Sequence, residues 1–239
     1  METTPGGWTV IDRDAGVFSA EYTFTKDGFA RCMTARMGDG SILLVSPGAR
    51  MSDACKDEIA ELGPVGAVMS NNGLHHLGIP EWRARFPEAS GYAPDLAASR
   101  IAKKNPEAGS LGGLAELQER AGDSFGVYEV ANTRVGESWV WVKTELGYVW
   151  YVSDILINMA KPPAAFVPRM LFTMTKSAPG FRVFNLSLAF AVKNKKATLR
   201  ALLEQMDAHP PAVIVPAHGE VLAGPTLAAE AKALIEAAL

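Results

Sequence analysis

The sequence predicts an α/β sandwich, because groups of strand-like segments alternate with helical ones. Short, wholly apolar runs at 42–45 and 65–69 are bounded by turn residues, which is typical of strands buried on both faces. Helical patterns follow these runs, and an alanine-rich helical segment ends the sequence. This order favours sheets covered by helices over a helical bundle or an all-β fold. The 239 residues are 48% apolar, so we expect one domain over 1–239 with a sizeable core.

The first half is predicted to begin with β-structure and to continue with alternating elements. Ser52 is a suitable N-cap for a helix that should end at Gly63-Pro64. The expected strands of this half are 8–11, 17–25, 29–37, 42–45, 65–69 and 90–93. Helical segments are expected at 52–62 and 77–86, with a loose helical connection over 95–125.

The second half returns to β-structure over 126–158. The segments 138–142 and 147–153 have the spacing of a hairpin. Residues 161–180 are expected to be helical or irregular, and 181–184 is either a strand or part of a helix that continues into 197–206. A short strand at 213–215 and a helix over 226–239 complete the prediction.

Composition excludes several classes of protein. The 23 Lys+Arg against 26 Asp+Glu give a net charge of -3, which offers no basic footprint for nucleic acid. Cys32 and Cys55 are too few for a disulfide framework and are expected in the core. The first residues lack the pattern of a signal peptide, and no apolar run reaches the ~18–20 residues that span a bilayer. We therefore expect a cytoplasmic protein that does not bind membranes.

Three histidines and one aspartate follow predicted strand ends. His75 and His76 come after the strand at 65–69, Asp154 directly follows 147–153, and His218 follows 213–215. Loops after strand ends converge at one edge of an α/β sheet, so these groups could surround a metal ion. Ordinary roles stay open for each group: a surface His pair, a helix cap at Asp154 and a turn at His218. His209 is expected in a loop, mostly facing solvent.

The order of these motifs resembles the metallo-β-lactamase superfamily, in particular a branch with a modified first metal motif. The resemblance covers roughly 40–225. It rests on Ser46-Pro47, the segments 61–65 and 71–76, Glu81-Trp82, 86–89, 151–154 and 215–219. It implies a four-layer αββα sandwich with the metal site at one sheet edge.

The resemblance also implies which ligands remain. The family's first motif is His-x-His-x-Asp-His. With His76 as its last residue, the two first-site histidines are replaced by Asn71 and Gly73. The third first-site histidine falls near Glu137. The second site survives as His75, His76, Asp154 and His218, which implies one divalent ion, Zn first, with Fe or Mn as alternatives.

Three functions follow from this interpretation. The first is a hydrolase that uses one metal-activated water on a small ester, thioester, lactone or phosphoester, with Glu137 or Asp154 moving the proton. The second is a catalytically degenerate module that binds a small molecule or a protein. The third is an oxidoreductase with iron at the same site.

Two groups of apolar residues have structural interpretations. Trp139, Trp141, Trp150 and Tyr151 are expected as core or cross-strand contacts. Packing is the default expectation for a second group, with an apolar substrate pocket or a homodimer face as alternatives. This group comprises Met159, Phe166, Met170, Phe172 and Met174.

Overall fold

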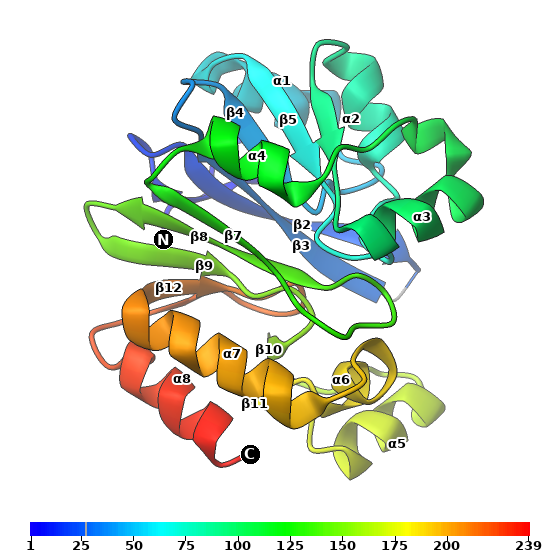
Figure 1. Ribbon diagram of the computed structural model, residues 1–239, viewed down its shortest axis with the longest axis vertical. Coiled ribbons are helices and arrows are strands. Elements are labelled where there is room, and N and C mark those ends of the chain that lie inside the picture. The colour runs from blue at the N-terminus through cyan, green and yellow to red at the C-terminus, as the bar shows by residue number, and fades with distance from the viewer. Residues whose placement is uncertain (27) are drawn as a thin grey trace.

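Two β-sheets face each other and carry helices on their outer faces, as Figure 1 shows. The computed structural model describes residues 1–26 and 28–239. The helices are α1 (Asp53–Leu62), α2 (Ile79–Arg85), α3 (Asp95–Lys104), α4 (Leu114–Ala121), α5 (Phe166–Met174), α6 (Asn185–Ala191), α7 (Lys195–Ala208) and α8 (Leu227–Glu236), with a 3₁₀ turn at Pro106–Ala108. The predicted αββα sandwich is confirmed.

The first sheet has the strand order β1-β2-β3-β4-β5-β6. Its strands are β1 (Thr9–Asp12), β2 (Val17–Thr25), β3 (Gly28–Arg36), β4 (Ile42–Val45), β5 (Val65–Met69) and β6 (Ser90–Tyr92). Strands β1 to β4 form an antiparallel meander, whereas β4, β5 and β6 are parallel. The change to parallel pairing requires helical crossovers, and α1 and α2 supply them.

The second sheet has the order β13-β12-β9-β8-β7. Its strands are β7 (Phe125–Glu129), β8 (Ser138–Thr144), β9 (Gly147–Tyr151), β12 (Pro211–Val215) and β13 (Leu222–Ala223). Strand β12 runs parallel to β9, so the loops that follow both strands leave the sheet at the same edge. A separate ribbon of β10 (Leu156–Met159) and β11 (Gly180–Val183) lies between β9 and α6 in the sequence.

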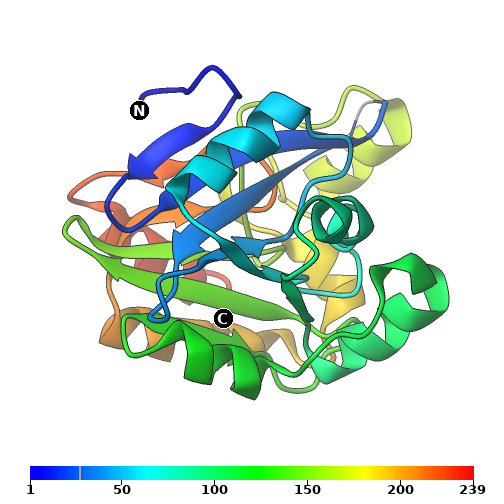
Figure 2. The same cartoon turned by 90° about the horizontal axis from the view of Figure 1, so that it is seen from above.

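Three apolar layers hold the sandwich together. The layer between the sheets contains Met33, Val140 and Tyr151, and Leu117 of α4 closes it at the β7 side. A second layer, around Trp82, joins the first sheet to α1, α2 and α3. The third layer packs the second sheet against α6, α7 and α8. Figure 2, seen from above, shows α1 crossing the strands of the first sheet.

The loops at the site edge begin with strained backbone. Ser46 follows β4 with φ 54°, and Ser153 follows β9 with φ 53°. Positive φ is uncommon for residues other than glycine and is often retained where it aims a functional side chain. The bend at Ser153 comes directly before Asp154, whose side chain is buried at this edge.

Most of the predicted elements are present, and the expectations for His209 and for the apolar residues of α5 need correction. His209 is half-buried rather than mostly solvent-facing, because its ring stacks on Trp141 with centroids 4.0 Å apart. The prediction that Phe166 and Met174 pack in the core is wrong, because these residues of α5 are 70% and 72% exposed. Met170 is exposed as well.

Over the described residues, none of the helices combines the length and apolar character needed to span a bilayer.

Candidate metal centre

Three loops bring His75, Asp154 and His218 to one point. His75 lies in the loop between β5 and α2, Asp154 follows β9, and His218 follows β12. One ligand atom from each residue lies within 4.8 Å of the others. Asp154 and His75 are buried, whereas the His218 side chain retains 19% exposure. The cluster therefore has an enclosed side and an open side.

The Asp154 carboxylate lies between the two imidazole rings. The distance from His75 Nε2 to Asp154 Oδ2 is 3.2 Å, and His218 Nε2 is 3.2 Å from Asp154 Oδ1. Charge-assisted N–H···O contacts are usually about 2.7–2.9 Å, so both contacts are long for ion pairs. Ligand atoms about 2.0–2.2 Å from a tetrahedral zinc ion lie roughly 3.3 Å apart. The observed separations suit neighbouring ligands of one ion.

The hydrogen bond on the far side of His218 fixes which nitrogen faces the carboxylate. His218 Nδ1 lies 2.7 Å from the carbonyl oxygen of Phe29, which can only accept a hydrogen bond. Nδ1 therefore carries the proton, and in a neutral imidazole Nε2 presents a lone pair to Asp154 Oδ1. Two acceptors at this distance repel each other unless a cation lies between them. That cation is either a second proton on His218 or a metal ion.

The two ring nitrogens that face away from Asp154 both have partners. His75 Nδ1 lies 3.3 Å from the Tyr22 hydroxyl, and His218 Nδ1 donates to Phe29. Metal-binding histidines almost always have such a partner on the second nitrogen, which fixes the tautomer and the ring orientation. Burial raises the pKa of Tyr22, so its hydroxyl keeps its proton.

Electrostatics favour a negative charge on Asp154. Burial alone would raise the pKa of Asp154, but His75 and His218 hold that pKa well below its usual range. Burial lowers the pKa of His218, yet its contacts with Asp154 and the Phe29 carbonyl outweigh this effect and raise that pKa. The pair thus attracts a cation whether it is a proton or a metal ion.

His76 is not part of this cluster. Its Nδ1 lies 3.2 Å from the Asn105 side-chain nitrogen, and the Asn105 amide also donates to the His76 carbonyl. Of the two adjacent histidines, only His75 contributes a ligand atom to the cluster with Asp154 and His218. The structure thus differs from the predicted four-ligand set. Burial and the neighbouring His75 and Arg100 lower the pKa of His76, which keeps the ring neutral.

Solved structures share this fold over nearly the whole chain. The mono-zinc form of the metallo-β-lactamase FIM-1 from Pseudomonas aeruginosa superposes with TM-score 0.60 and 15% identity, covering 100% of this chain and 98% of that one. A metallo-β-lactamase from Pontibacter korlensis gives TM-score 0.58 and 13% identity, with 96% and 98% coverage. The chain has the metallo-β-lactamase fold.

A third similar structure widens the range of chemistry on this fold. It is a fragment of a diflavin flavoprotein from Nostoc sp. PCC 7120, with TM-score 0.60, 10% identity and coverage of 96% of this chain and 94% of that chain. In sequence, no family model and no curated protein matches the chain. The comparisons therefore establish the fold and leave the activity to be argued from the site.

A buried polar network occupies the positions that the resemblance assigns to the first metal of the metallo-β-lactamase fold. Asn71 donates to the Ser153 hydroxyl and accepts from the Ser46 hydroxyl. Ser153 in turn donates to Glu137, and the Asn72 amide lies 3.2 Å from Glu137 Oε2. All five side chains are fully buried. This network fills the space with hydrogen-bonded side chains, and none of the described residues in it carries an imidazole that could hold a first ion.

Glu137 is enclosed within this network and does not line the cavities at the centre. Burial, and then the charge of Asp154, raise the pKa of Glu137 well above its usual value. Asn72 connects Glu137 and Asp154, because its amide nitrogen lies close to both side chains and 3.1 Å from Asp154 Oδ2. Glu137 therefore does not lie where it could pass a proton to a substrate, which was its predicted role. Its contacts instead orient Asn72 and, through it, Asp154.

Sequence reasoning missed three groups that shape the centre. Tyr22 belongs to an ordinary strand, Phe29 contributes only its backbone carbonyl, and Asn72 is one of two adjacent asparagines. In sequence, the Asn71-Asn72-Gly73 segment has the composition of a turn. Its burial was the missing information, since an asparagine that is fully enclosed must satisfy its amide on neighbouring side chains.

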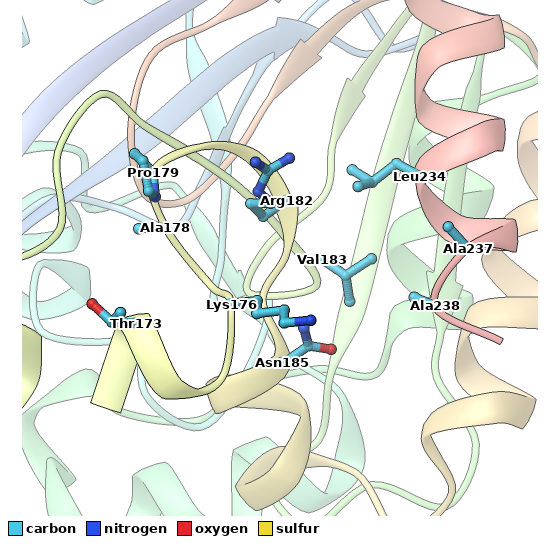
Figure 3. Close-up of a pocket in the computed structure, with 10 residues that line it drawn as sticks. All are labelled: Thr173, Lys176, Ala178, Pro179, Arg182, Val183, Asn185, Leu234, Ala237 and Ala238. Atoms are coloured by element: carbon cyan, nitrogen blue, oxygen red, sulfur yellow. The ribbon is translucent and has the colours of Figure 1, made fainter. Parts of the chain in front are cut away.

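Two adjoining cavities open at the candidate centre. The smaller, about 280 Å³, is lined by Tyr22, Leu74, His75, Asp154 and His218, with Phe24 and Leu77. The larger, about 510 Å³, begins at His218 and extends toward α5. Another cavity of about 380 Å³ lies between the β11 region and α8, and none of its lining residues belongs to the centre (Figure 3).

The first prediction concerns Gly219, which fixes the position of His218. Gly219 has φ +102°, and a Cβ there would lie 1.8 Å from the Asn158 carbonyl oxygen. Gly219→Ala should lower the free energy of unfolding by more than the ~1–3 kcal/mol expected from backbone strain alone. Urea denaturation measures the loss.

Gly40→Ala is the matched control for this prediction. Gly40 also has positive φ, +84°, but an added Cβ would meet nothing within 4 Å. Gly40→Ala should therefore show the strain without the clash. Equal losses in the two variants would contradict the role assigned to the close approach at Gly219.

The second prediction concerns the raised pKa of Glu137 in metal-free protein. A folded-state pKa above the unfolded value gives stability that is complete below the unfolded pKa, near 4.5, and declines as pH rises. Glu137→Gln removes this titration, so its Tm relative to wild type should increase from pH 5 to pH 9. Thermal unfolding after chelation measures this difference, and parallel pH profiles would contradict the assignment.

Proposed function

We propose that the chain is a metal-dependent hydrolase with a single divalent ion held by His75, Asp154 and His218. The observation that carries the proposal is the 3.2 Å distance between His218 Nε2 and Asp154 Oδ1, on a ring whose Nδ1 already donates to the Phe29 carbonyl. A zinc ion suits two imidazoles and one carboxylate and leaves a coordination position open in catalytic sites. The proposed substrates are small esters, thioesters, lactones or phosphoesters.

The bound ion would supply a Lewis acid that activates water near neutral pH. The residues of this chain have separate tasks around it. Phe29 fixes the His218 tautomer through its carbonyl, and Asn72 holds Asp154 Oδ2. Tyr22 lines the smaller cavity with a protonated hydroxyl, so it can donate a hydrogen bond to a substrate oxygen there.

Of the two carboxylates, only Asp154 lies at the centre. It lines the smaller cavity, whereas Glu137 does not. Its low pKa keeps it ionised, which suits a metal ligand and makes it a weak base. We assign a ligand role to Asp154 and a positioning role to Glu137.

Iron is the second candidate, and the composition of the cluster favours it. Two histidines and one carboxylate with open positions are the ligand set of many non-haem iron oxygenases. The same three residues therefore fit an oxidoreductase function. Zinc as the bound ion would leave only the hydrolase, because the oxidoreductase requires a redox-active metal and Zn²⁺ is not one.

The third prediction is the metal content of protein purified without a histidine tag. We expect about one Zn, Fe or Mn per chain by elemental analysis, because three ligands and an open position form one mononuclear site. His218→Ala should lose most of this metal and all turnover on a panel of esters and phosphodiesters.

His76→Ala is the matched control, because His76 faces Asn105 instead of the cluster. It should keep its metal and its turnover. Absence of metal in wild type after reconstitution with each ion would contradict the proposal. Metal binding without turnover on any substrate would instead support a binding module.

A further inference from the structure

The larger cavity beside the centre has the features of a binding site for a hydrocarbon group. We propose that it takes the acyl chain of the substrate, so that the substrate class is an ester or thioester of a medium-length hydrocarbon acid. This inference rests on the proposed function for its catalytic part. The binding part can be tested without metal or turnover.

The cavity is continuous with the candidate centre. Phe24 and His218 line both it and the smaller cavity. The His218 ring lies between two phenyl rings, with centroid distances of 6.1 Å to Phe24 and 5.9 Å to Phe184. A chain in the larger cavity would thus lie directly beside a ligand of the ion. Its carbonyl end would face Asp154 and His75.

The lining of the larger cavity is mostly apolar. Phe24 and Phe29 contribute from β2 and β3, and Met159 follows from β10. Pro168 and Phe172 of α5 form the opposite wall, and Phe172 packs against Phe184 with centroids 5.3 Å apart. The volume of about 510 Å³ lies within the ~300–1,000 Å³ usual for small-molecule sites.

The charged residues that line the cavity are Glu21, Glu220 and Lys161. The buried Arg31 contacts the carboxylates of Glu220 at 3.4 Å and Glu21 at 4.0 Å. Because one Arg pairs with two carboxylates, these three residues and Lys161 carry no excess of either charge. A fatty acid, whose hydrocarbon chain matches the apolar part of the lining, is a suitable probe.

The structure also explains the apolar residues that do not pack in the core. Met159 and Phe172 are half-buried because they line this cavity. Of the alternatives that the sequence left open, the apolar pocket is thus the one that a cavity in the structure supports. The outer face of α5 is exposed, and nothing in the described residues covers it.

The test is displacement of a fluorescent fatty acid, cis-parinaric acid, from metal-free protein by hexanoate, octanoate and decanoate. We expect affinity to rise roughly fourfold for each added methylene, because each one leaves water for an apolar wall. Ala164→Phe fills the cavity from an exposed loop and should weaken decanoate binding at least tenfold. Ala229→Phe, on the exposed side of α8, is the control and should bind as wild type does.

Absence of fatty acid binding, or equal affinity in the two variants, would overturn the inference. Kinetics distinguish it from the proposed function. If p-nitrophenyl acetate and p-nitrophenyl octanoate are hydrolysed with equal kcat/KM, and Ala164→Phe changes kcat/KM for neither ester, the hydrolase stands and the acyl site fails. If decanoate binds as expected but the protein takes up no metal after reconstitution with each ion, the acyl site stands and the hydrolase fails.

Discussion

The structure depends on a cation between His218 and Asp154. The Phe29 carbonyl assigns the His218 proton to Nδ1, so the opposite nitrogen meets a carboxylate oxygen at 3.2 Å. Three separate loops converge on this point, and each is held in place: Asp154 by the bend at Ser153, His218 by Gly219 against Asn158, and His75 by Tyr22. Without a positive charge at the centre, these constraints would press two acceptors together.

The network around Glu137 occupies the positions that the family resemblance assigns to a first metal ion. Asn71, Asn72 and Ser153 satisfy one another and the carboxylate, so the space beside the centre is filled with hydrogen-bonded groups. A half-satisfied buried network would be costly, which favours keeping all of its members together. The same network orients Asp154 through Asn72, and it thereby links the first-site positions of the fold to the ligand that remains.

The order of the elements could be predicted from the sequence because buried strands and capped helices have local signals. Val65–Met69 and the helix after Ser52 are such cases. The side to which a loop residue points has no local signal, which is why His76 was grouped with His75. The burial of Glu137 and the stacking of His209 on Trp141 likewise depend on distant segments. The order of the motifs in the sequence indicated where the candidate centre lies. Which side chains belong to it depends on how the loops pack.

The most direct measurement is anomalous diffraction from crystals at the zinc and iron absorption edges. The account predicts one peak, about 2.0–2.2 Å from His75 Nε2, His218 Nε2 and an Asp154 oxygen, with no peak beside Asn71 or Glu137. The edge at which it appears identifies the ion. No peak at this point in crystals of protein reconstituted with zinc or iron, or a peak beside Asn71 or Glu137 instead, would contradict the account.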